Sequence, residues 1–211
     1  MTMPYPDLRH YSLRDYGNRV GVQRVLKALD AASVTPTFAV NTRLFERNPL
    51  LREQIVERGD EIICHSWSMD TVHAGGLDEA EEKELVQRSL SRLRELTGQQ
   101  VRGWLSPGKL ESPNTLDLIA AEGVEYVTDW INDEVPYKYN TASGDLWSMP
   151  LSTEISDTFT LVDNLHSEES WADQVCDAAD LLHAEAQTRG GRILTLTLTP
   201  WLVGQPHRIK H

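Results

Sequence analysis

At six predicted strand ends, polar side chains follow short apolar runs of the sequence. They are Asn41, His65, Ser66, Ser106, Asp129, Glu154 and Thr199. In a parallel sheet covered by helices, ligands bind beyond the carboxyl ends of the strands. We therefore expect these side chains to converge on one site.

His65 is the sharpest candidate because it directly follows the apolar run at residues 61–64. A histidine in that position can serve as a general acid, a general base or a metal ligand. The alternative is a histidine that is simply hydrogen-bonded within a loop.

Asp129 and Glu154 each follow a predicted strand, and both are predicted to be catalytic together with His65. A carboxylate can orient a histidine or act as a base. The alternative for each is a capping or loop carboxylate. If the two are buried near each other, repulsion raises the pKa of one of them. Paired carboxylates beside a histidine suit the hydrolysis of an amide.

Three further side chains are predicted to bind the substrate. Arg19 can clamp a carboxylate or a carbonyl oxygen, although its spacing slightly favours the alternative, an ion pair with Asp15. Trp104 and Trp130 lie near strand ends, where aromatic rings often wall small-molecule pockets. Packing in the core is the alternative for either tryptophan.

A metal site has little support in the sequence. A catalytic zinc usually takes three protein ligands. His65 and His73 do not stand at a recognised ligand spacing, and Asp70 adds only a weak third candidate. We predict no metal and no other cofactor, with zinc as the alternative.

The elements that must position these residues alternate along the chain. Predicted strands cover residues 36–40, 61–64, 101–105, 125–128, 146–151 and 192–198. Predicted helices cover residues 18–32, 49–58, 78–96, 112–122 and 167–189. Such alternation indicates an α/β fold with a parallel sheet and outer helices. The length of 211 residues suits a single domain over residues 1–211.

Charge and composition exclude several classes of partner. The net charge of −12 argues against nucleic acid and against an anionic membrane surface. No apolar run approaches the roughly 20 residues of a membrane span. The segment MTMPYPDLRHYSL lacks the pattern of a signal peptide, and two cysteines do not make a disulfide framework. We expect a cytoplasmic protein with a small-molecule substrate.

Five blocks of the sequence resemble the polysaccharide deacetylase superfamily, and within it the allantoinase-like branch of urate catabolism. They are YSLRDYGNRVG at 11–21, ERGDEIICHS at 57–66, GWLSPG at 103–108, YVTDWINDE at 126–134 and TPWLVGQPHR at 199–208. The resemblance implies a distorted (β/α) barrel that hydrolyses C–N bonds in N-acetylated sugars or cyclic amides. It also adds His207 to the substrate-binding candidates, beside Asn41, Ser66, Ser106 and Thr199 from the strand ends.

The departures from the family pattern concern the reactive groups. His65 matches the first histidine of the family's His-[Ser/Thr]-x-x-His motif, but Met69 stands at the second. Thr199 replaces a late histidine. The family's first strand normally precedes Tyr11, and relatives continue beyond Arg208. The resemblance therefore implies a barrel without its first strand and its C-terminal end, and without most of the metal triad.

Three functions follow as alternatives. The first is a metal-independent hydrolase of a small amide, cyclic amide or ureide. The second is an enzyme with the same pocket that catalyses cyclisation, dehydration or isomerisation. The third is a non-catalytic binding protein. A missing first strand would expose sheet edges, and unpaired edges favour a homo-oligomer.

Overall fold

The computed structural model describes residues 7–211, which divide into two compact units. Residues 36–151 form one of them, here called the sheet unit. The described residues 7–35 and 152–211 form the other, the helical unit. That residues 1–211 make a single domain stays a prediction.

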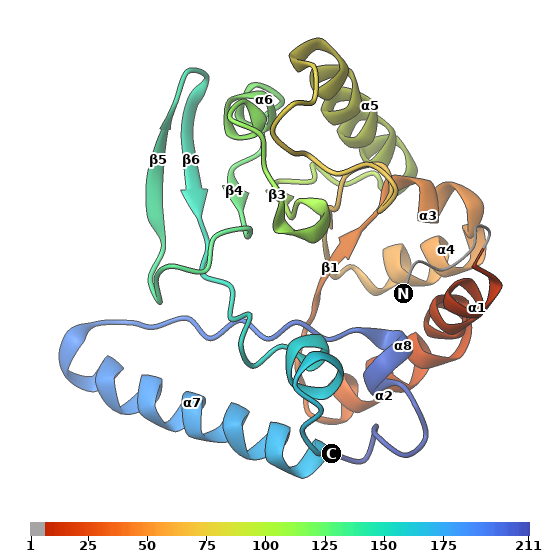
Figure 1. The fold of residues 1–211 in the computed structure, drawn as a ribbon, viewed down its shortest axis with the longest axis vertical. Coiled ribbons are helices and arrows are strands. Elements are labelled where there is room, and N and C mark those ends of the chain that lie inside the picture. The colour runs from red at the N-terminus through yellow and green to blue at the C-terminus, as the bar shows by residue number, and fades with distance from the viewer. Residues whose placement is uncertain (1–6) are drawn as a thin grey trace. The chain divides into compact units, whose positions relative to one another are not determined.

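The sheet unit is built on six strands in the order β1-β2-β3-β4-β6-β5 (Figure 1). They are β1 (Thr37–Val40), β2 (Glu61–Cys64), β3 (Gly103–Trp104), β4 (Tyr126–Val127), β5 (Tyr137–Thr141) and β6 (Gly144–Ser148). Strands β1, β2, β3, β4 and β6 pair in parallel, and β5 pairs with β6 antiparallel. The predicted α/β fold with a mostly parallel sheet is confirmed, and within the described residues the sheet is open and does not close into a barrel.

Four helices pack against one another and against this sheet (Figure 1). They are α3 (Thr42–Arg47), α4 (Pro49–Arg58), α5 (Glu79–Thr97) and α6 (Thr115–Ala121). Ile62 and Cys64 are two residues apart on β2, so both point to the same face and enter the core with Phe45, Leu90 and Ile119. This core holds the carboxyl ends of the strands in fixed positions.

Helix α5 forms where the sequence predicts it, because both of its ends are capped. The Asp78 side chain accepts hydrogen bonds from the backbone N–H groups of Ala80 and Glu81. Three glutamates in the first turn complement the helix dipole. Gly98 ends the helix in the left-handed conformation at φ 70°, which glycine adopts without strain.

Strands β3 and β4 are shorter than predicted. Val101 has a φ of 50°, so the extended backbone cannot start there and β3 begins at Gly103. A Cβ on Gly103 would lie 2.5 Å from Cγ2 of Ile63. Glycine therefore allows β3 to approach β2 closely at the start of the GWLSPG block.

Three other expectations from the sequence need correction. The sequence analysis missed β5, which forms a hairpin with β6 through residues 141–144. Helix α6 begins at Thr115 and not at Ser112, because the Ser112 hydroxyl accepts the Asn114 backbone N–H in a turn before the helix. Residues 192–198 do not form a strand, although the Ser152 backbone N–H donates to the carbonyl oxygen of Thr195 at 3.4 Å. A strand needs a neighbouring strand for its backbone groups, and the described part of the helical unit contains no strand.

The helical unit contains α1 (Leu8–Tyr16), a π-helical turn (Gly17–Gly21), α2 (Val22–Ala31), a second π-helical turn (Phe159–Asp163), α7 (Glu168–Arg189) and α8 (Pro200–Val203). A Cβ on Gly17 would lie 2.7 Å from the backbone nitrogen of Trp201, and one on Gly21 would lie 2.8 Å from the carbonyl carbon of Pro200. The glycines of the YSLRDYGNRVG block therefore make room for α8.

Candidate functional site

Three neighbouring strands of the sheet unit bring the strongest candidates together. His65 follows β2, Ser106 lies beyond β3, and Asp129 lies beyond β4. Nδ1 of His65 lies 2.6 Å from the carbonyl oxygen of Leu105, and the backbone N–H of Ser106 donates to Oδ1 of Asp129 at 2.7 Å. His65 and Asp129 are therefore tied to adjacent residues of one loop, at the carboxyl edge of the sheet.

The hydrogen bond to Leu105 fixes the tautomer of His65. A carbonyl oxygen can only accept, so Nδ1 carries the hydrogen and Nε2 keeps its lone pair in the neutral ring. Burial lowers the pKa of His65, although the bond to Leu105 partly opposes this. The neutral imidazole therefore offers Nε2 as an acceptor or base.

Asn41 holds the backbone at His65. Its side-chain amide donates to the carbonyl oxygen of His65, and the His65 backbone N–H donates to Val40 O at 2.9 Å. Asn41 therefore fixes the path of the chain at His65, and its predicted contact with a substrate stays a prediction.

Ser66 belongs to a buried chain of hydrogen bonds. Its hydroxyl lies 2.9 Å from Nε2 of His73, whose Nδ1 lies 2.9 Å from Oε1 of Glu82. The order hydroxyl, imidazole, carboxylate is that of a hydrolase triad. However, all three residues are 0% exposed, and Glu82 also accepts the Ser112 and Thr115 hydroxyls. These hydrogen bonds therefore hold Ser66 in its left-handed conformation (φ 57°) next to His65. A contact of Ser66 with substrate stays a prediction.

The two predicted tryptophans differ in their surroundings. Trp104 is fully buried, and its indole N–H donates to Oγ of Ser106 at 2.8 Å, which fits the core-packing alternative. Trp130 is 42% exposed, and its indole N–H donates to Oε2 of Glu111 at 3.0 Å. Trp130 is therefore the tryptophan that a substrate can reach.

Glu111 is a site residue that the sequence analysis missed. It interacts directly with Asp129, and burial together with that neighbour raises the pKa of Glu111 to about 8. Burial also raises the pKa of Asp129, against hydrogen bonds from Ser106. Glu111 follows no strand, so its signal in the sequence was only its closeness to the GWLSPG block.

The other predicted site residues belong to the helical unit, so they are described by their local partners. Arg19 forms an ion pair with Asp15 at 3.6 Å, the alternative that its spacing allowed. The backbone carbonyl of Glu154 accepts the Thr160 hydroxyl at 3.0 Å. His207 is exposed. Roles for Arg19, Glu154 and His207 in a site with His65 stay predictions.

Thr199 has a carboxylate partner that the sequence analysis also missed. Its hydroxyl donates to Oδ1 of Asp157 at 2.9 Å, and its backbone N–H donates to Oδ2. Burial raises the pKa of Asp157, while both bonds from Thr199 oppose this. The local geometry gives Thr199 a role in anchoring Asp157, and its predicted contact with substrate is not tested by these bonds.

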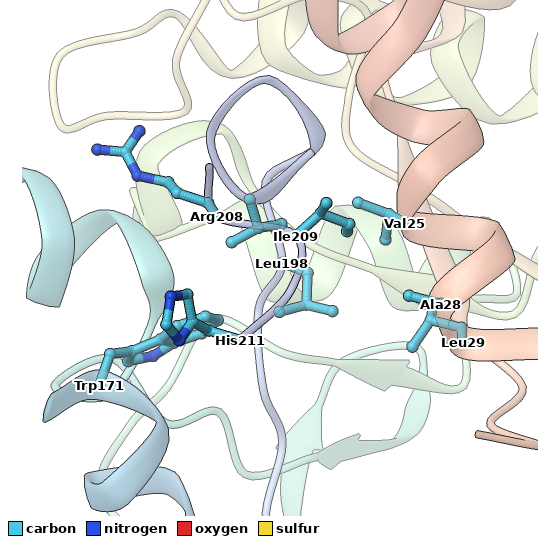
Figure 2. Close-up of a pocket in the computed structure, with 9 residues that line it drawn as sticks. Val25, Ala28, Leu29, Trp171, Leu198, Arg208, Ile209 and His211 are labelled. Carbon is cyan, nitrogen blue, oxygen red and sulfur yellow. The ribbon is translucent and has the colours of Figure 1, made fainter. Parts of the chain in front are cut away.

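The helical unit also contains a half-open, largely apolar pocket of about 190 Å³ (Figure 2). Figure 2 shows Val25, Ala28 and Leu29 of α2 on one side of it and Trp171 of α7 on the other. Its polar lining residues are engaged elsewhere: Arg208 pairs with Glu168 at 2.9 Å and His211 with Glu169 at 3.5 Å. The lining contains none of the predicted site residues.

The described residues do not fit the metal that the family resemblance implies. No group of three His, Cys, Asp or Glu side chains in residues 7–211 is arranged to hold an ion. Met69, at the position of the second histidine, is 53% exposed and has a thioether, which zinc rarely accepts. His73 is buried between Ser66 and Glu82. We therefore derive no step through a metal.

Comparisons with known proteins agree with the fold. The polysaccharide deacetylase family model matches residues 10–127. The crystal structure of the PuuE allantoinase superposes with a TM-score of 0.87 at 29% identity, over 97% of this chain and 67% of that one. A probable polysaccharide deacetylase of Pseudomonas aeruginosa PAO1 superposes with a TM-score of 0.84 at 32% identity, over 94% of this chain and 66% of that one.

Curated relatives match over shorter stretches. A peptidoglycan deacetylase-like protein of Gibberella zeae is 28% identical over 123 residues, which is 57% of this chain and 36% of that protein. The peptidoglycan deacetylase of Helicobacter pylori is 25% identical over 134 residues, or 44% of its length. The chain thus spans less than half of these two relatives.

None of the helices in residues 7–211 is long and apolar enough to cross a bilayer.

Proposed function

Because the chain belongs to the polysaccharide deacetylase family, we propose that it is a hydrolase of a C–N bond in a small amide, cyclic amide or ureide. The observation that carries the proposal is the meeting of His65 and Asp129 at the loop after β3, inside the blocks that define the resemblance. The likeness to the PuuE allantoinase over nearly the whole chain favours a cyclic amide over a polymer.

We propose separate tasks for His65 and Asp129. The neutral His65 accepts a hydrogen bond at Nε2, so it can orient the attacking water or an N–H of the substrate. Asp129, held by the Ser106 N–H, is the carboxylate that takes the proton of water as the oxygen bonds to the carbonyl carbon. The exposed ring of Trp130 offers a flat apolar wall to a planar ureide.

The reaction proceeds without a metal, since the described side chains do not form a three-ligand site. We also propose that the protein acts in the cytoplasm, and fractionation of the source cells tests that location.

A substrate panel tests the proposed function. The purified protein is incubated with allantoin, hydantoin, succinimide and oligomers of N-acetylglucosamine, and C–N cleavage is followed by proton NMR. We expect cleavage of one of the cyclic amides and no release of acetate from the sugars. Acetate release alone would replace the cyclic amide by an N-acetyl group, and no cleavage of any compound would contradict the proposal.

Replacement of His65 by Ala tests the site itself. We expect kcat/KM to fall at least about 100-fold with an unchanged circular dichroism spectrum, because the base or orienting group is lost. The matched control is His183→Ala, which removes an exposed histidine of α7. Equal activities of the two variants would remove His65 from the reaction.

A further inference from the structure

Two buried carboxyl oxygens in the sheet unit lack a hydrogen-bond donor among the described residues. Among the described residues, no N–H or O–H donor reaches Oδ2 of Asp129 or Oε1 of Glu111. Both groups are acceptors when ionised, and a buried acceptor without a donor costs free energy. The two carboxyl groups contact each other, so a single proton between them satisfies both oxygens.

We propose that Glu111 and Asp129 share one proton, and that this carboxyl pair is the acid and base of the site, with Glu111 protonating the leaving nitrogen. The inference rests on the proposed hydrolysis and extends it to a residue outside the predicted strand ends.

The surroundings decide which partner carries the proton. Asp129 accepts the backbone N–H of Ser106 at 2.7 Å, and the positive charge of Lys109 favours its ionised form. Glu111 accepts the indole N–H of Trp130 at 3.0 Å. Asp129 is therefore the carboxylate and Glu111 the carboxylic acid. In agreement, burial and the charge of Asp129 raise the pKa of Glu111 to about 8.

One of the other titratable groups around the pair lies in the segment of Glu111, and two come from further segments. Lys109 precedes Glu111 by two residues, and its charge acts on Asp129. His73, in the loop after β2, favours the ionised form of Glu111. Tyr139 of β5 packs edge-on against Trp130 with ring centroids 5.6 Å apart, and burial raises its pKa, so its phenol stays neutral. The interactions with Lys109 and His73 therefore oppose the shared proton but do not outweigh burial.

A carboxyl pair that holds one proton can catalyse hydrolysis and return to its starting protonation state. Water adds to the carbonyl carbon, its oxygen forms the new C–O bond, and one of its protons passes to the Asp129 carboxylate. The C–N bond then breaks, its electron pair stays on nitrogen, and Glu111 gives that nitrogen its proton. The pair begins and ends with one proton, so transfer of the proton from Asp129 to Glu111 restores the starting state.

The shared proton can be tested without a substrate. Protein labelled with ¹³C at the glutamate side-chain carboxyl is titrated by NMR from pH 4 to pH 10. We expect one resonance with a midpoint near pH 8, which is absent in Glu111→Gln and present in Glu84→Gln, a variant of an exposed glutamate on α5. In Asp129→Asn that midpoint should fall by one pH unit or more. Titration of every glutamate below pH 6 in the wild-type protein would overturn the shared proton.

Turnover tests the catalytic half of the inference. With a cyclic amide that the wild-type protein cleaves, Glu111→Gln should lower kcat at least 100-fold and remove the fall of activity above pH 8, while Glu84→Gln keeps both. An unchanged kcat in Glu111→Gln would overturn the role as acid. Titration near pH 8 without cleavage of any panel compound would refute the proposed function and leave the shared proton in place. If Glu111→Gln does not fold, Glu111→Asp replaces it in both experiments.

Discussion

The sheet unit and the helical unit contain polar groups of different kinds. In the sheet unit, His65, Asp129 and Glu111 are linked through Leu105, Ser106 and Trp130, and acceptor atoms of the pair lack donors from the described residues. In the helical unit, the carboxylate of Asp157 accepts two bonds from Thr199, and the pocket is walled by apolar side chains. In the sheet unit, the buried carboxyl oxygens of Asp129 and Glu111 that lack a donor among the described residues therefore mark the candidate site, and no cavity is needed to find it.

The largest expected effect distinguishes Asp129 from Glu154, the two carboxylates predicted to be catalytic. Asp129→Asn should lower kcat/KM about 10³-fold, because the base for water is lost. Glu154→Gln, in the helical unit, should lower it less than about tenfold. The measurement is steady-state hydrolysis of the cyclic amide found in the panel. Equal losses would show that the helical unit contributes a group to the reaction.

The second effect concerns the packing of the helical unit. Gly21→Ala should destabilise the protein by about 3 kcal/mol, since the new Cβ would collide with the backbone of Pro200. Gly191→Ala adds a Cβ that meets nothing within 4 Å and should change the free energy of unfolding by less than about 0.5 kcal/mol. Urea unfolding monitored by tryptophan fluorescence measures both. A Gly21→Ala protein as stable as the wild type would contradict the close contact with α8.

The third effect is a pH dependence of stability that belongs to Glu111. Because its pKa is raised to about 8 in the folded protein, the folded state binds more protons than the unfolded state between about pH 4.5 and pH 8. The stabilisation is complete below the unfolded pKa and is lost as the pH rises through 8. After allowance for solvent screening, we expect a loss of about 2 kcal/mol.

Urea unfolding at pH 5 and pH 8 measures this loss. Glu111→Gln should show a smaller fall than the wild-type protein, and Glu84→Gln the same fall. A Glu111→Gln protein with the wild-type pH dependence would assign the titration to another group, such as Asp157 in the helical unit, whose pKa burial also raises.

The smallest expected effect is that of a chelator. Dialysis against EDTA should change kcat/KM by less than about twofold, because the described residues do not provide three metal ligands. Elemental analysis of the same sample should find well under one zinc per chain. A loss of activity that zinc restores would contradict the metal-independent proposal.

Local patterns sufficed to predict much of the sheet unit. The apolar run before His65 became β2, and the caps at Asp78 and Gly98 placed α5. The convergence of His65, Ser106 and Asp129 followed from the parallel order of their strands. These features depend on neighbours in sequence or on a general property of parallel sheets.

The failures arose where distant residues decide the structure. Residues 192–198 have the β-branched and apolar composition of a strand, but composition does not supply a partner. Glu111 enters the site through contacts with Asp129 and Trp130, which lie 18 and 19 positions further along the chain. Ser66 and Glu82 meet only through His73. No local spacing encodes such contacts.

The contact of the π-helical turn with α8 has a consequence for synthesis on the ribosome. The side chain of Arg24 donates to the carbonyl oxygen of Gly204 at 3.0 Å, across a separation of 180 residues. Helices α1 and α2 leave the ribosome before α8, so Gly17 and Gly21 in the turn between them lack their contact with α8 until residues 200–203 are made. Residues 36–151 complete their own core earlier. The surface around Gly17 and Gly21 is thus buried later than the core of residues 36–151, and during that interval it is open to chaperones and proteases.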